Sequence, residues 1–310
     1  MTRDEDRTAA LMTPAMLAQL RMKPKPDAAP GAWLNQMASD AGSGHARRLV
    51  DLHQQLLAQA RERDVAAMQE ALRAAAEELV RVDLARVQPK GWLARATGRG
   101  KEEASAFIGQ VDRMNTALEQ VEEQVHALRK KHQTQTAALE RSLAEFDTEV
   151  QAVEGIIDQG ARWLQDMRGQ LRVRQTQAPD AAAQEQIAED TERCELLVVR
   201  MKQLRAANSA AQHARELCQS AAARRAKLLE HLQQLLEGEA RKWQQCLSPL
   251  AEQAARSGAT PDAMEPARAA GTELEAALKQ AAKDCRQLAR QDGEFVEELT
   301  VLARPLEAAA

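Results

Sequence analysis

Apolar residues that alternate in steps of three and four are the feature that most constrains this fold. Two long runs follow this spacing, on either side of a polar interruption. Such a heptad repeat is typical of a coiled coil, in which each helix packs one apolar stripe against a partner helix. The stripe positions are Val111, Met114, Leu118, Val121, Val125 and Leu128 in the first run, and Leu143, Phe146, Val150, Val153, Ile157, Gly160, Leu164, Met167 and Leu171 in the second.

Together the two runs predict one long helix over about 101–174. Its length would be roughly 110 Å at about 1.5 Å per residue, so we expect it to protrude or to pair with an equally long partner. A partner helix is predicted after Pro179, where apolar residues resume and continue to Leu250, with an alanine-rich polar stretch at 206–226. The two helices are therefore expected to form an antiparallel hairpin with its tip near 175–185.

Changes of pattern divide the chain into four segments. They are a flexible N-terminal arm with a proline-rich linker (1–31), an N-terminal helical segment (32–88), a basic elbow followed by the long hairpin (89–256) and a C-terminal heptad helix (257–310). The second segment should contain a helix over about 45–87, either continuous or broken once, and the fourth should open with a turn at 257–266. The expected fold class is all-α, an elongated antiparallel helical hairpin or coiled-coil bundle with a long central helix.

The composition excludes several classes of protein. Aromatic residues make up only 2% of the chain and tyrosine is absent, which leaves little material for a packed sheet or an aromatic-stacking nucleic-acid module. A net charge of −4 also argues against nucleic acid as a partner. No secretion signal or membrane span is recognisable, and the four cysteines form no CxxC pair, so we expect a cytoplasmic protein with reduced thiols.

No motif in the sequence indicates catalysis. The six histidines are scattered without metal-ligand spacing, so we expect neither a metal site nor a cofactor. The chain has no phosphate-binding glycine loop and no nucleophile elbow. Cys194 and Cys285 fall in phase with leucines and are interpreted as small core residues. We therefore expect that the protein is not an enzyme.

Three residues interrupt the apolar stripe of the long helix. His132 and Gln135 occupy stripe positions, where polar residues commonly fix the register of a coiled coil or mark an exposed length of helix. A polar binding point within the bundle is the alternative. Gly160 also falls on the stripe, and we interpret it as a helix-packing residue whose missing side chain lets a neighbouring helix approach closely.

The basic elbow is the best candidate for ligand contact in the sequence. Between residues 81 and 101, six cations accompany a single acidic residue, Asp83, and two glycines precede the start of the long helix. Backbone N–H groups and cations at a helix N-terminus can hold an oxyanion, and a tryptophan there can dock on the bundle or enter an anionic membrane surface. A loop that is simply solvated is the other interpretation. The candidate anion or membrane contacts are Lys90, Trp92, Arg95, Arg99 and Lys101.

Four stretches of the sequence carry a family resemblance. In chain order they are RDVAAMQEALRAAAEELVRVDL (63–84), GWLARATGRGK (91–101), VEGIIDQGARWLQDM (153–167) and LLEGEARKWQQCL (235–247). Together they resemble the toxic anion resistance family, the TelA/KlaA proteins linked to tellurite resistance, over about residues 45–250. One departure is the alanine-rich stretch at 213–232, where the family often carries an amide-rich segment.

The resemblance implies an α-helical cytoplasmic protein associated with resistance to tellurite or related stress, with no catalytic residue to carry over. We therefore expect a non-enzymatic resistance or stress-response protein that acts through a coiled-coil bundle and partner proteins, with an anionic membrane surface as a further contact of the elbow. The alternative is a coiled-coil scaffold or adaptor without anion chemistry, whose helical seams bind protein partners or a second copy. A thiol-dependent oxyanion reductase rests only on the four cysteines.

Overall fold

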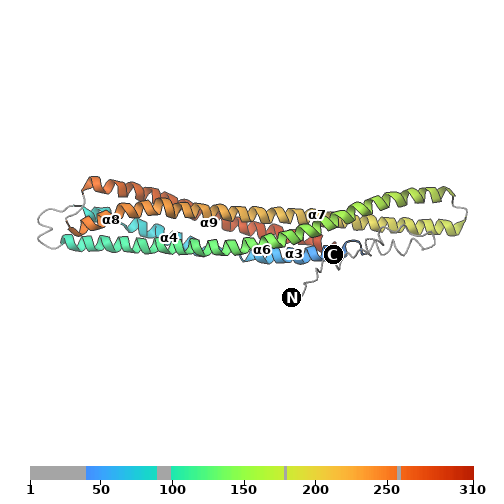
Figure 1. The fold of residues 1–310 in the computed structure, drawn as a ribbon, viewed down its shortest axis with the longest axis horizontal. Helices are drawn as coiled ribbons and strands as arrows, with labels where there is room; N and C mark the ends of the chain where they lie inside the picture. The colour runs from blue at the N-terminus through green and yellow to red at the C-terminus, as the bar shows by residue number, and fades with distance from the viewer. Residues whose placement is uncertain (1–39, 89–98, 178–179, 257–259) are drawn as a thin grey trace, which may run out of the picture. The chain divides into compact units, whose positions relative to one another are not determined.

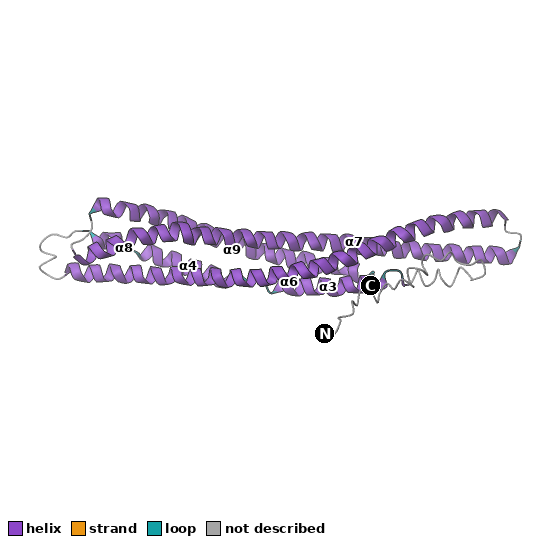
Figure 2. Cartoon of the chain, in the orientation of Figure 1, coloured by secondary structure: helices purple, strands orange, loops and turns teal. Residues whose placement is uncertain are grey.

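The computed structural model describes residues 40–88, 99–177, 180–256 and 260–310. Within these ranges the regular elements are all helical and no strand is present (Figure 2). The structure thus confirms the all-α fold class. The N-terminal arm expected at 1–31 lies outside the described residues.

Long helices make up most of the described chain. In chain order the elements are α3 (Ser43–Arg61), α4 (Ala66–Arg81), the short 3₁₀ helix η1 (Leu84–Val87), α6 (Arg99–Gln177), α7 (Ala181–Leu235), the π-helical turn η2 (Leu236–Ala240), α8 (Arg241–Arg256) and α9 (Pro261–Glu307). The central helix α6 contains 79 residues, which confirms the long helix expected over about 101–174. The next helix, α7, begins within the expected tip at 175–185.

The helix expected over 45–87 is broken once, between α3 and α4. Asp64 lies in the break, and its Oδ1 accepts a hydrogen bond of 2.8 Å from the backbone N–H of Ala66, where α4 begins. The turn expected at 257–266 is wrong in extent, because α9 already begins at Pro261. Proline suits the first position of a helix, since the N–H that it lacks would have no helical partner there.

The chain divides into two compact units, each assembled from separate stretches of sequence. Unit 1 consists of Met1–Ala58, Glu140–Glu216 and Glu298–Ala310, and unit 2 consists of Gln59–Leu139 and Leu217–Glu297. Both α6 and α7 contribute residues to each unit. Neither unit therefore corresponds to one continuous segment of the sequence.

In unit 1, α6 and α7 lie side by side and run in opposite directions (Figure 1). The heptad stripes of the two helices form a buried seam, as the repeat predicts. Buried residues of this seam include Leu164, Met167 and Leu171 of α6, and Ile187, Cys194 and Leu197 of α7. Close to the tip, Nη1 of Arg174 donates a hydrogen bond of 2.8 Å to Oδ2 of Asp190, which ties the two helices together.

The start of α3 packs against the same two helices in unit 1. Gly42 adopts a positive φ of 71°, and a Cβ added there would lie 3.2 Å from the side chain of Leu204. Glycine is therefore favoured at this position by backbone conformation and by space. The preceding carbonyl, that of Ala41, accepts a hydrogen bond of 3.0 Å from Nε of the buried Arg200.

Unit 2 has one continuous apolar core, to which α4, α6, α7, α8 and α9 contribute. Trp243 of α8 is buried in this core. It packs against Gly271 of α9, where an added Cβ would lie 3.3 Å from the indole Nε1. The expected heptad stripe of α9 is buried in the same core at Leu274, Leu278 and Cys285.

Gly160 offers a direct test of packing in the seam between α6 and α7. A Cβ at this position would come within 2.5 Å of Sδ of Met201. We expect Gly160→Val to lower the free energy of unfolding by about 1–3 kcal/mol, because the larger side chain overpacks the seam. Urea denaturation of the purified protein measures this change.

Gly155→Ala is the matched control on the same helix. Nothing lies within 4 Å of the Cβ that this substitution adds. Alanine in place of a helical glycine should raise the free energy of unfolding by up to about 1 kcal/mol. A stability gain at both positions would contradict a packing role for Gly160.

Candidate functional site

The basic elbow expected from the sequence lies mostly outside the described residues. Lys90, Trp92 and Arg95 fall in the stretch 89–98, which the structure does not describe. Arg99 and Lys101 belong to the first turn of α6, where only the backbone is described. A different group of cations is fully described in unit 1.

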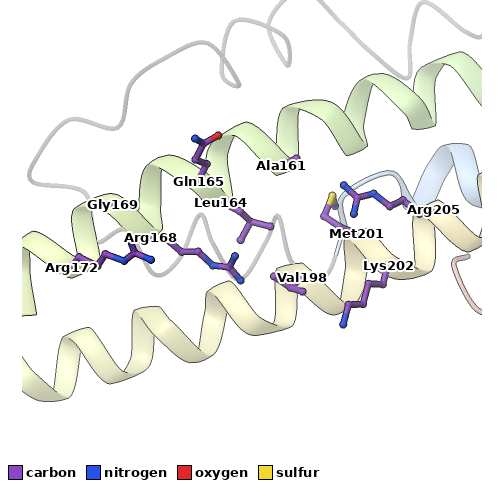
Figure 3. Close-up of a pocket in the computed structure, with 10 residues that line it drawn as sticks. All are labelled: Ala161, Leu164, Gln165, Arg168, Gly169, Arg172, Val198, Met201, Lys202 and Arg205. Carbon is purple, nitrogen blue, oxygen red and sulfur yellow. The ribbon is translucent and has the colours of Figure 1, made fainter.

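A groove between α6 and α7 gathers four cationic side chains (Figure 3). Arg168 and Arg172 lie four residues apart on α6, and Lys202 and Arg205 lie three residues apart on α7. Apolar or small residues and one amide form the rest of the lining: Ala161, Leu164, Gln165, Gly169, Val198 and Met201. The groove, with a volume of about 420 Å³, thus combines an apolar floor with cationic rims.

No carboxylate lines this groove. All four cations are exposed, and no ion pair involving them is found among the described residues. Two other arginines of the hairpin do have acidic partners: guanidinium nitrogens of Arg174 and Arg193 lie 2.8 and 3.1 Å from the carboxylate oxygens of Asp190, and Arg193 also pairs with Glu189. The groove is therefore a local concentration of positive charge, which attracts anionic groups. Arginine pairs can hold carboxylates or phosphates by charge-assisted hydrogen bonds.

A second polar cluster, which we call the ionic layer, lies in unit 2 and consists of Arg63, Arg225 and Asp292. Nη2 of Arg225 on α7 donates a hydrogen bond of 2.7 Å to Oδ2 of Asp292 on α9. Nη1 of Arg63, in the break between α3 and α4, lies 3.9 Å from the other oxygen of Asp292. The same guanidinium lies over the ring of Phe295, with Cζ 5.0 Å from the ring centroid. Three separate stretches of the chain thus meet at one buried carboxylate.

The ionic layer carries more positive than negative charge. Its two guanidinium groups share one carboxylate, and the Arg225 side chain is only 1% exposed. Nε and Nη1 of Arg225 have no hydrogen-bond partner among the described residues. Burial lowers the pKa of Arg63, and the nearby Asp292 opposes this shift. Withdrawing an ion from water costs several kcal/mol, so burying this layer in an otherwise apolar core opposes folding.

His132 of α6 experiences the charges of this layer. Burial lowers the pKa of its imidazole below 6.5, and the positive charges of Arg225 and Arg63 lower it further. The imidazole is therefore mainly neutral at pH 7. The polar residue at this stripe position thus lies within the electrostatic influence of the buried guanidinium groups.

Three of the four cysteines, Cys194, Cys218 and Cys285, are buried. Burial raises the pKa of Cys194, raises that of Cys218 to about 11 and raises that of Cys285 to about 12. These thiols stay protonated at neutral pH, whereas the thiolate is the reactive form. The interpretation of Cys194 and Cys285 as small core residues is confirmed by their burial.

The described residues contain no group of three or more His, Cys, Asp or Glu side chains placed to hold a metal ion. Among the described helices, none has the length and apolar character needed to cross a membrane. No family model matches the chain, and neither a curated protein nor a solved structure matches it. The resemblance to the toxic anion resistance family therefore stays a prediction from the residues that carry it.

The sequence analysis predicted neither the groove nor the ionic layer, although some of their residues have a recognisable spacing in the sequence. Arg168 and Arg172 each directly follow a stripe residue and are four residues apart, so the sequence places both arginines on one face of the helix beside the seam. Arg225 lies three residues before Leu228 and so continues the stripe of the returning helix, which indicates a buried position. Arg63 gives no such signal, because it lies in the break between two helices.

Asp292→Ala tests whether the carboxylate holds the ionic layer together. The substitution leaves Arg63 and Arg225 buried without a negative partner, so we expect the free energy of unfolding to fall by about 3–5 kcal/mol. The triple variant Arg63→Met, Arg225→Met, Asp292→Leu is the control, and should be near wild-type stability or above it because no buried charge remains. Urea denaturation compares the two. A loss as large in the triple variant as in Asp292→Ala would contradict a charge-based role.

Acidification should destabilise the protein through His132. Its folded pKa lies below the unfolded value of about 6.5. The stability that this neutral imidazole contributes is therefore complete above about pH 6.5 and is lost as the pH falls toward the folded pKa. Denaturation midpoints measured between about pH 7.5 and about pH 5.5 should drop less for His132→Gln than for the wild type. Identical drops would show that His132 does not contribute.

Proposed function

We propose that this chain is a non-enzymatic helical scaffold that binds anionic partner surfaces, and that its cellular role is resistance to toxic anions such as tellurite. The groove in unit 1 carries this proposal, because four exposed cations and an apolar floor form a surface suited to binding. The anion-resistance part rests on the family resemblance in the sequence. The groove supports it independently, since it concentrates positive charge in a chain whose net charge is −4.

The state of the three buried thiols supports a role without thiol chemistry. Reduction of an oxyanion by cysteine needs an accessible thiolate. Burial raises the pKa of Cys218 and Cys285 well above neutrality, which disfavours that form. Free buried thiols also suit a reducing compartment, in agreement with the cytoplasmic location that we propose.

A scaffold or adaptor without anion chemistry is the second candidate. Two features favour it. The heptad seam holds α6 and α7 side by side, and the break between α3 and α4 places Arg63 in the ionic layer. Both keep the helices in a fixed arrangement, which a scaffold needs in order to present its binding surfaces. The two candidates agree on a binding role for the groove. They differ in whether loss of the protein changes tolerance of tellurite.

Tellurite tolerance of a deletion strain tests the first candidate. We expect the strain to be more sensitive than its parent, and the wild-type gene to restore tolerance. A gene encoding Arg168→Glu, Arg172→Glu should fail to restore it, because the variant reverses the charge of one rim of the groove. A gene in which all four cysteines are replaced by alanine should still restore it.

Arg162→Glu is the control for charge reversal, because this exposed residue of α6 does not line the groove. It should restore tolerance as the wild type does, and circular dichroism should show equal helicity for all variants. Unchanged tolerance in the deletion strain would refute the resistance role and leave the second candidate. Failure of the cysteine-free gene alone would instead indicate thiol chemistry.

A further inference from the structure

Helix α7 of unit 1 carries a strip of residues whose charges change sign at its centre. Residues spaced by three, four and seven lie on one face of a helix. Such spacings connect Glu192, Glu195, Val198, Val199, Lys202 and Arg205. We call these six residues the α7 strip. Its first half is acidic, its middle is apolar and its last half, which belongs to the groove, is basic.

The α7 strip is open to solvent along most of its length. Its four charged residues are exposed, Val198 is half-buried and Val199 is 52% exposed. Leu196, beside the strip, is 53% exposed. Neither glutamate and neither cation of the strip makes an ion pair within the described ranges. A neighbouring acid of the same helix, Glu189, is instead paired with Arg193 at 3.1 Å, whereas the four charges of the strip are open to a partner outside the chain.

The order of charges along the strip is self-complementary. Glu195 and Lys202 lie at equal distances on either side of the pair Val198 and Val199, and the outer residues Glu192 and Arg205 do so as well. When two such helices pack antiparallel about a two-fold axis at this pair, each glutamate lies opposite a cation of the other copy. Two-fold contacts of this isologous kind are the commonest in homo-oligomers.

We propose that a second copy of this chain occupies the groove, with the α7 strips of the two copies packed antiparallel. Glu195 of each copy faces Lys202 of the other, Glu192 faces Arg205, and the valines meet at the centre. Arg168 and Arg172 on the opposite rim of the groove add positive charge beside the incoming glutamates (Figure 3). This inference rests on the proposed function, because it names the partner that the scaffold's groove binds.

The chemistry of the groove favours this occupant over an anionic lipid or a free oxyanion. A lipid or an oxyanion would pair with the cations alone and leave Glu192, Glu195 and Val199 exposed. A second copy pairs all four charges of the strip and covers the apolar centre from both sides. The contact centres on one helix of each copy and is therefore small, so a dimer in equilibrium with the monomer is expected. Added salt should weaken it, because exposed charge pairs are screened.

Charge exchange between two variants tests the dimer. Sedimentation equilibrium of the purified full chain should show a mass that rises with concentration from that of the monomer toward twice that value. The variant Glu192→Lys, Glu195→Lys has a wholly cationic strip, and the variant Lys202→Glu, Arg205→Glu has a wholly acidic one. Each variant alone should remain monomeric because its strips repel each other, and an equimolar mixture of the two should associate into heterodimers.

Glu123→Lys, Glu230→Lys is the matched control, since it changes the net charge by the same amount at exposed positions of α6 and α7 that belong to unit 2 and not to the strip. It should associate as the wild type does. A wild-type chain that stays monomeric, single variants that still associate, or a mixture that does not associate would each overturn the proposal. These results are independent of tellurite tolerance in the deletion strain, so failure of the dimer and failure of the proposed function are distinguishable.

Discussion

The apolar seam between α6 and α7 is the interaction on which the rest of unit 1 depends. Buried stripe residues such as Leu164 and Leu197 hold the two helices together, and Gly160 leaves room for Met201, whose Sδ would lie 2.5 Å from an added Cβ. The seam also fixes which residues remain outside it. Arg168 and Arg205 come to line one groove because their helices are locked side by side, so a packing constraint places the candidate site.

Unit 2 departs from a purely apolar interior at the ionic layer. Asp292 is shared by two buried guanidinium groups, and the neutral imidazole of His132 lies within their electrostatic influence. Burying these charges costs free energy. The cost is smallest when the three stretches of chain are aligned so that both guanidinium groups reach Asp292. We infer that the ionic layer selects among the alternative alignments that a regular heptad repeat would otherwise permit.

The groove gathers four exposed cations and no carboxylate among its lining residues. Arg174 and Arg193 are balanced by Asp190 together with Glu189, whereas the cations of the groove are not balanced within it. Buried, protonated thiols at Cys218 and Cys285 offer little for catalysis. The distribution of charge therefore supports recognition of a partner. The acidic first half and basic second half of the α7 strip support recognition of a second copy.

The sequence by itself determined the helical class, the long central helix, the hairpin tip and the burial of Cys194 and Cys285, because a heptad repeat states both the period of a helix and its buried face. It also marked His132 as an exception. Tertiary structure alone decided that Arg63 and Arg225 share Asp292, and that Arg168 and Lys202 line the same groove. Local periodicity shows which face of a helix is buried, but which residues from distant helices meet depends on the register and direction of packing.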